Sequence, residues 1–180
     1  DAEVILLAYD FLTALGLTGL TLKLNSVGCP ACRPVYRERL QAYFKEYLPT
    51  LCDDCKDRYT RSPLRILDCK RDAEQPFMAG DPAITDCLCP ACTEHFEQVQ
   101  QHLTAAGVSY ELDPRLVRGL DYYTRTAFEI AYPPLGAQSA VAGGGRYDGL
   151  VEELGGNPTP AVGFAAGLER VLLALEQQNL

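Results

Sequence analysis

Apolar and polar residues follow a helical spacing at the start of the chain and a strand spacing directly after it. Between residues 2 and 15 the apolar side chains recur every three or four positions, which is typical of an amphipathic helix. Gly16 favours the end of that helix. Residues 20–25 alternate leucines with polar side chains and predict a half-buried strand. A helix followed by a strand is common to many folds, so this opening indicates no function.

The pattern changes between residues 29 and 106, where the chain carries more charge and is mostly helical. Helical spacing predicts a helix over residues 33–47, with Pro34 in its first turn, and another over residues 90–106. Three parts are therefore expected. Residues 1–28 and 107–180 form a core, and residues 29–106 form a cysteine-bearing helical insertion between them.

Strand patterns return after Gly107. Residues 127–132 and 139–142 predict an antiparallel hairpin, because a Pro-Pro-Leu-Gly turn separates them. Three glycines at 143–145 follow the second strand, and they suit either a flexible turn or a close approach of backbone to a ligand. Residues 160–167 predict a small-residue strand that leads into a final helix.

One stretch, residues 116–129, joins an arginine and a glycine to two adjacent tyrosines. Its sequence, LVRGLDYYTRTAFE, predicts a polar loop that runs into a half-buried strand. Adjacent strand residues point to opposite faces, so Tyr122 and Tyr123 cannot both be core, and one of them should face a pocket. An ordinary tyrosine-rich amphipathic strand is the competing interpretation.

The composition is that of a globular chain, with 47% hydrophobic and 22% charged residues. The sequence has no apolar run of about 18 residues, so we expect no membrane span. The first residues also lack the basic start of a signal peptide. A net charge of −8 and a pI near 4.7 argue against non-specific nucleic-acid binding through bulk positive charge.

All eight cysteines lie between residues 29 and 92. Two thiols separated by two residues suit tetrahedral zinc, because the short turn directs both sulfurs at one ion. Three such pairs are present: Cys29 with Cys32, Cys52 with Cys55, and Cys89 with Cys92.

The two outer pairs flank the insertion and are expected to meet at its base. We predict one four-thiolate zinc site there, built from Cys29, Cys32, Cys89 and Cys92. The remaining pair and the isolated Cys69 would form an incomplete second set. Reduced, partly buried thiols without metal are the alternative interpretation.

Three stretches taken together resemble the histidyl-tRNA synthetase family. Residues 116–129 resemble its first histidine signature, and residues 142–150, AGGGRYDGL, resemble the second. Residues 163–170, GFAAGLER, resemble motif 3 of class II aminoacyl-tRNA synthetases. The cysteine-bearing block sits where bacterial members carry an insertion domain. The resemblance implies an α+β fold, in which an antiparallel sheet of the class II synthetase type is flanked by helices and carries a mostly helical insertion.

The resemblance also implies roles for two arginines. Arg118 would contact the α-phosphate and the histidine carboxylate while the adenylate forms, since a guanidinium stabilises growing negative charge without losing its proton. Arg170 would stack on the adenine ring of ATP as a planar cation.

The histidine pocket would be lined by Tyr123 and Tyr147, with a contribution from Tyr122. A phenol can hydrogen-bond an imidazole nitrogen, which discriminates against side chains that lack this nitrogen. Gly144 and Gly145 would let the backbone form one wall of the pocket.

The family activates histidine with ATP and Mg²⁺ and transfers it to tRNA(His), so the resemblance implies these partners and a cytoplasmic homodimer. Structural Zn²⁺ in the insertion is a further expected cofactor. The chain does not contain class II motif 1, which carries the dimer interface, or motif 2, which grips ATP. We therefore expect a piece of a synthetase catalytic domain that does not aminoacylate alone.

Two other functions compete with this interpretation. The regulatory subunit of ATP phosphoribosyltransferase shares the fold and lacks aminoacylation activity, but its histidine signatures are typically degraded, whereas both are whole here. A free-standing zinc module that binds RNA would leave those signatures without a purpose, and the acidic balance disfavours it.

Overall fold

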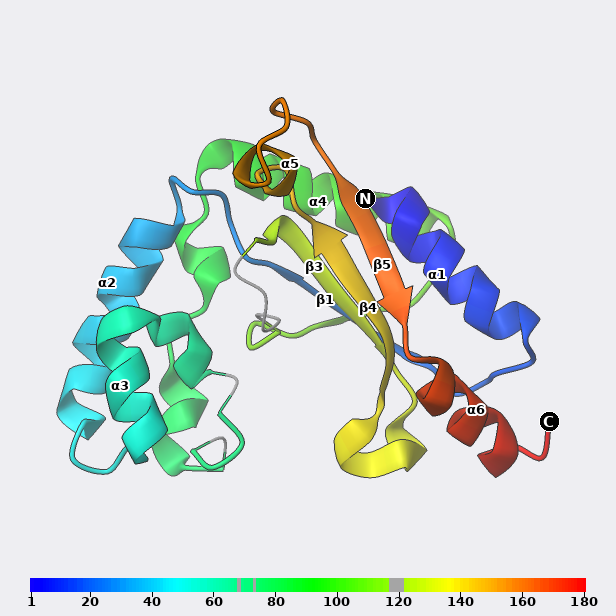
Figure 1. The fold of residues 1–180 in the computed structure, drawn as a ribbon, viewed down its shortest axis with the longest axis horizontal. Helices are drawn as coiled ribbons and strands as arrows, with labels where there is room; N and C mark the ends of the chain where they lie inside the picture. The colour runs from blue at the N-terminus through cyan, green and yellow to red at the C-terminus, as the bar shows by residue number, and fades with distance from the viewer. Residues whose placement is uncertain (68, 73, 117–121) are drawn as a thin grey trace.

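The structure is a computed structural model that describes residues 1–67, 69–72, 74–116 and 122–180 (Figure 1). The α-helices in these ranges are α1 (Ala2–Ala14), α2 (Arg33–Phe44), α3 (Asp53–Arg61), α4 (Pro90–Ala105), α5 (Leu150–Glu153) and α6 (Leu168–Gln177). The strands are β1 (Thr21–Ser26), β2 (Glu111–Leu112), β3 (Thr124–Ala131), β4 (Ala140–Arg146) and β5 (Val162–Ala166). The 3₁₀ helices are η1 (Lys45–Tyr47), η2 (Pro63–Ile66), η3 (Pro76–Gly80), η4 (Ile84–Cys87) and η5 (Pro133–Gln138).

The strands form one sheet in the order β2-β1-β3-β4-β5. The short β2 pairs with β1 in parallel, and the other neighbouring pairs are antiparallel. β3 and β4 are the two strands of the predicted hairpin, and η5 fills the predicted turn between them. The expected α+β fold, a mostly antiparallel sheet flanked by helices, is confirmed.

Strand β4 is longer than the sequence pattern indicates. We expected the glycines at 143–145 to follow the strand, but all three lie inside it and pair with both β3 and β5. The pattern failed here because glycine carries no side chain to report an alternation of faces.

The main core lies between one face of the sheet and helices α1 and α4. Phe128 and Leu24 are fully buried there, and Leu12 of α1 and Leu103 of α4 pack into the same cluster. Helix α4 falls inside the predicted insertion of residues 29–106, yet its apolar side packs on the core of the sheet.

Helices α2 and α3 lie at one side of the sheet and build a second core (Figure 1). Tyr36, Leu40 and Phe44 line the buried side of α2, one helical turn apart, and Ile66 and Met78 fill the space opposite. Within the described ranges, no helix combines the length and the apolar character needed to cross a membrane.

Replacing Phe128 by alanine should destabilise the protein by about 3–5 kcal/mol, because it removes a fully buried ring from the centre of the main core. Phe11→Ala is the matched control, since this ring is 44% exposed and should cost less than about 1 kcal/mol. Urea unfolding followed by circular dichroism measures both. Equal losses would contradict the assignment of the core.

Candidate functional site

Three tyrosines from the two histidine-signature stretches lie together on the face of the sheet that the main core leaves open. The ring centroids of Tyr122 and Tyr123 are 4.7 Å apart, and the Tyr147 ring lies 5.9 Å and 6.4 Å from them. Val27 and Ala127 pack beneath this cluster. Tyr123 is buried, whereas Tyr122 and Tyr147 are half-buried. The three tyrosines that the sequence predicted for the histidine pocket therefore lie in contact in the fold.

The two adjacent tyrosines share a cluster because they precede the strand. β3 begins at Thr124, so the alternation of faces that we expected for Tyr122 and Tyr123 does not apply to them. A bulge follows at once, where Arg125 adopts a positive φ of 57° and the register with β4 shifts. Such bulges change the direction of nearby side chains.

Glycines in β4 and β5 allow the tyrosine rings to lie against the backbone. A Cβ at Gly145 would lie 2.3 Å from the Thr126 carbonyl oxygen and 2.8 Å from Cδ1 of Tyr123. A Cβ at Gly144 would lie 2.1 Å from the carbonyl oxygen of Gly163, on the other side of the strand. Glycine is required at both positions, because any side chain would separate the strands or displace a ring.

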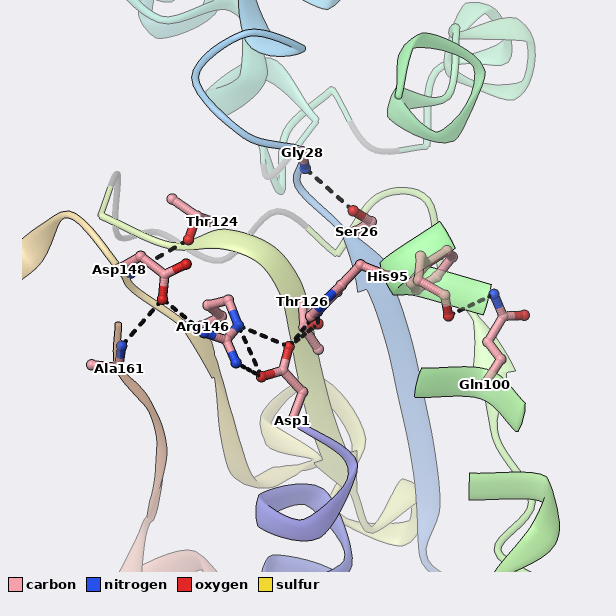
Figure 2. Close-up of polar contacts among 11 residues, drawn as sticks. Asp1, Ser26, Gly28, His95, Gln100, Thr124, Thr126, Arg146, Asp148 and Ala161 are labelled. Atoms are coloured by element: carbon pink, nitrogen blue, oxygen red, sulfur yellow. Dashed lines mark hydrogen bonds and ion pairs between the residues drawn. The ribbon is translucent and has the colours of Figure 1, made fainter. Parts of the chain in front are cut away.

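A buried ion pair holds the end of β4 in place (Figure 2). Arg146 donates from Nη2 and Nε to Oδ1 of Asp1 at 2.6 Å and 2.9 Å. The side chain of Asp1 is fully buried and that of Arg146 is 18% exposed. Thr126 donates to the same carboxylate at 2.5 Å, and Nε2 of His95 lies 2.7 Å from it. Residues from α4, β3 and β4 thus meet at the carboxylate of Asp1, the N-cap residue of α1.

The same arginine extends the network past Tyr147. Arg146 donates from Nη1 to Asp148 at 2.8 Å, and the Asp148 carboxylate also accepts the backbone N–H of Ala161 at 3.1 Å. The backbone N–H of Tyr147 donates to the Ala161 carbonyl at 2.8 Å. Both neighbours of Tyr147 are therefore anchored, which fixes the position from which its ring projects.

Of the two arginines predicted to contact ATP, the structure describes only Arg170. Arg118 lies outside the described residues. Arg170 is in the first turn of α6, where it is exposed and donates to the Ala140 carbonyl at 2.8 Å. Ala140 and Arg146 are the two ends of β4, so the strand separates Arg170 from the tyrosines by roughly 20 Å. The structure does not bring Arg170 into contact with the tyrosine cluster.

The four cysteines predicted to share a metal do come together. One sulfur from each of Cys29, Cys32, Cys89 and Cys92 lies within 4.8 Å of the other three. The Sγ of Cys29 is 3.6 Å from that of Cys32 and 3.9 Å from that of Cys89. Cys32 and Cys89 are the N-cap residues of α2 and α4, so the cluster sits where the chain leaves the sheet and where it returns.

Hydrogen bonds make the four sulfurs electrostatically unequal. Burial acts to raise the pKa of the Cys29 thiol, but donors that include the backbone N–H groups of Ala31 and Cys32 lower it to about 6. Burial, together with the neighbouring Cys89 and Cys29 thiols, raises the pKa of Cys92 to about 12. The backbone N–H of Cys89 also donates to the Cys32 sulfur at 3.2 Å.

Comparison with known protein families decides where the chain belongs. The sequence model of the family described as Histidyl-tRNA synthetase matches residues 81–171, which is half of the chain.

The chain belongs to the histidyl-tRNA synthetase family.

Individual proteins similar to this chain are described as members of the same family. A histidine–tRNA ligase of Symbiobacterium thermophilum is 56% identical over 100% of the chain, which covers 42% of that protein. One of Moorella thermoacetica is 59% identical over 99% of the chain and also matches over 42% of its own length. The crystal structure of apo S. aureus histidyl-tRNA synthetase superimposes with a TM-score of 0.78 at 39% identity, over 100% of this chain and 44% of that one. The chain thus spans less than half the length of these synthetases.

The alternative family is not favoured by these comparisons. A structure from Bacillus halodurans titled as an ATP phosphoribosyltransferase regulatory subunit/histidyl-tRNA synthetase is 21% identical, and this likeness shows the fold alone. The relatives at 56–59% identity are described as histidine–tRNA ligases.

Sequence reasoning missed the polar network around Asp1. Asp1, His95 and Arg146 are far apart in the chain, and no spacing rule joins them. One local signal was available, because Arg146 and Asp148 flank Tyr147 as a pair of opposite charges. A charged pair on either side of an aromatic residue at the end of a strand is a reason to expect an anchored side chain.

Arg146→Leu should destabilise the protein by about 3–5 kcal/mol, because it leaves the fully buried Asp1 carboxylate without its main counter-charge. The control is Arg170→Leu, which removes an exposed guanidinium with one backbone hydrogen bond and should cost less than about 1 kcal/mol. Urea unfolding compares the two variants. An Arg146→Leu loss as small as that of the control would mean that the ion pair is not required.

Proposed function

We propose that this chain is the histidine-recognising part of a histidine–tRNA ligase catalytic domain. The observation that carries the proposal is the contact of Tyr122, Tyr123 and Tyr147 with one another, with the Tyr123 ring against Gly145 of β4, in a member of this family. The proposed reaction joins histidine to ATP, forms histidyl-adenylate with release of pyrophosphate, and then transfers histidine to tRNA(His).

Recognition of histidine is assigned to the tyrosine cluster. The phenol groups of Tyr123 and Tyr147 would hydrogen-bond the imidazole, and Tyr122 would cover one side of it. The anchored backbone around Tyr147 supports this role, because a discriminating site needs polar groups that are held in place before substrate arrives. Gly144 and Gly145 are proposed to bring the backbone of β4 close to the substrate; the position of Gly145 against Tyr123 supports this, whereas Gly144 faces the backbone of β5.

Activation of histidine requires control of negative charge. A carboxylate oxygen of histidine attacks the α-phosphorus of ATP, a P–O bond forms, and the bond to the leaving pyrophosphate breaks. Arg118 is proposed to stabilise the charge that grows on the α-phosphoryl oxygens, and Arg170 to stack on adenine. Mg²⁺ would accompany ATP and neutralise phosphate charge. The separation of Arg170 from the tyrosines along β4 suits an extended substrate with adenine at one end and imidazole at the other.

The remaining expectations belong to the same proposal. The proposed division is core residues 1–28, insertion 29–106 and core residues 107–180. The separate core of α2 and α3 supports a distinct insertion, whereas α4, at its C-terminal end, packs on the core of the sheet. A cytoplasmic homodimer that binds tRNA(His) is implied by the family. The 180 residues alone are not expected to aminoacylate, since class II motifs 1 and 2 are not among them.

A structural Zn²⁺ ion held by Cys29, Cys32, Cys89 and Cys92 is also part of the proposal. Tetrahedral zinc with Zn–S bonds of about 2.3 Å sets neighbouring sulfurs about 3.8 Å apart. The measured separations of 3.6 Å and 3.9 Å fit this geometry. Four thiolates leave no open position for a substrate, so this ion would clamp the base of the insertion.

Binding of a non-hydrolysable histidyl-adenylate analogue tests recognition by calorimetric titration. The wild-type chain should bind the analogue, and Arg118→Ala and Tyr123→Phe should weaken it, the latter about tenfold through loss of one hydrogen bond. Tyr9→Phe on α1 is the matched control and should bind as the wild type does. No binding by the wild-type chain, or no loss in the two variants, would contradict the proposal.

Replacing one cysteine of the proposed four-thiolate site tests the zinc assignment. Cys32→Ser should release one zinc equivalent and lower the melting temperature, because a buried ligand of the clamp is lost. Cys87→Ser removes a cysteine outside this site and should retain the metal. Elemental analysis and thermal denaturation provide the readouts. Unchanged zinc content in Cys32→Ser would reject this site.

A further inference from the structure

A second group of potential metal ligands lies inside the core of α2 and α3. The sulfurs of Cys52, Cys55 and Cys69 and a carboxylate oxygen of Asp72 lie within 4.8 Å of one another. The Sγ atoms of Cys52 and Cys69 are 3.7 Å apart, close to the separation that a tetrahedral zinc ion imposes. The sequence alone indicated three cysteine ligands here, and the structure adds the Asp72 carboxylate as a fourth.

The local backbone presents these ligands in the same way as in the first cluster. Cys52 caps helix α3, and the N–H of Cys55 donates to its carbonyl at 2.9 Å. The Cys32 and Cys92 N–H groups make equivalent bonds to Cys29 and Cys89, each also at 2.9 Å. All three Cys-x-x-Cys pairs therefore form one type of turn at a helix start, which aims both sulfurs to the same side.

Asp72 completes the second cluster through a matching spacing. Cys69-Lys-Arg-Asp72 has two residues between its ligands, as a Cys-x-x-Cys pair does. The Asp72 carboxylate accepts the N–H of Cys52 at 3.2 Å, which turns it toward the thiols. This hydrogen bond joins the turn after η2 to the start of α3, so both halves of the cluster are held together without a metal.

The carboxylate of the second cluster is buried among sulfurs, where a positive counter-charge would be favourable. Asp72 is 3% exposed, Cys55 is fully buried and Cys69 is 6% exposed. In the part of the chain that the structure describes, no lysine or arginine forms an ion pair with Asp72. The Cys52 N–H already donates to this carboxylate, and a cation among the three sulfurs would add the counter-charge that the described residues do not supply.

We propose that Cys52, Cys55, Cys69 and Asp72 bind a second Zn²⁺ ion. Three thiolates and one carboxylate form a closed four-coordinate set of the kind that suits structural zinc, whereas Mg²⁺ and Ca²⁺ prefer oxygen ligands only. A disulfide would use two of the sulfurs and would leave the carboxylate without a role. The second ion would tie α3 to the following turn within the small core of α2 and α3. This proposal is independent of histidine activation.

Metal counting by native mass spectrometry tests the proposal on the 180-residue chain purified without chelator. The wild type should carry two zinc ions. Cys55→Ser should carry one, and Cys92→Ser should also carry one, because each variant loses a different site. Cys87→Ser is the matched control and should keep two. One ion in the wild type together with none in Cys92→Ser would overturn the second site.

Cobalt(II) substitution then distinguishes the two sites by their ligands. The sulfur-to-cobalt charge-transfer absorption of Cys92→Ser should report three thiolates, and that of Cys55→Ser should report four. If Cys55→Ser fails to fold, alkylation of the native wild type decides instead. Cys52, Cys55 and Cys69 should then react only after chelation, whereas Cys87 reacts at once. Equal reactivity before chelation, or a Cys52–Cys69 disulfide in the native chain, would reject the proposal.

Discussion

A buried carboxylate constrains the whole region around the tyrosines. The side chain of Asp1 has no exposed surface, so its charge must be balanced inside the protein. Arg146 of β4 provides the counter-charge, and Thr126 of β3 and His95 of α4 make polar contacts with the same carboxylate. The arginine that neutralises Asp1 also fixes the backbone on which Tyr147 stands. The position of Tyr147 in the tyrosine cluster therefore depends on this buried ion pair.

The first cysteine cluster is connected to the same region by short covalent and hydrogen-bonded paths. Gly28, next to Cys29, accepts the backbone N–H of Arg125 at 2.8 Å, so the turn before the cluster holds the bulge at the start of β3. Arg33, next to Cys32, donates to the carbonyl of Tyr123. His95 follows Cys92 by one helical turn. A metal clamp at the base of the insertion would thus help to fix the histidine-signature residues.

Much of this organisation could be predicted from sequence, and the failures have physical reasons. The β3–β4 hairpin was predictable because alternation and a Pro-Pro-Leu-Gly turn are local signals. The cysteines at 29, 32, 89 and 92 were predictable because pair spacing indicates a common target. The extension of β4 through the glycines was missed, since residues without side chains show no pattern. Asp72 was missed because a carboxylate is common on surfaces, and only burial reveals its unusual position.

The two largest hydrophobic cores of the described chain are that of the sheet and that of α2 and α3. Leu88 packs against both cores, and the first cysteine cluster joins them at the point where the chain passes from one to the other. The α2–α3 unit is small, and its two ends meet at that cluster. With the proposed zinc bound at this cluster, its removal would raise the rate of amide hydrogen exchange and proteolytic cleavage in α2 and α3 first, while β1, β3 and α4 keep their protection. Metal supply would set the lifetime of one part of the molecule without setting that of the other.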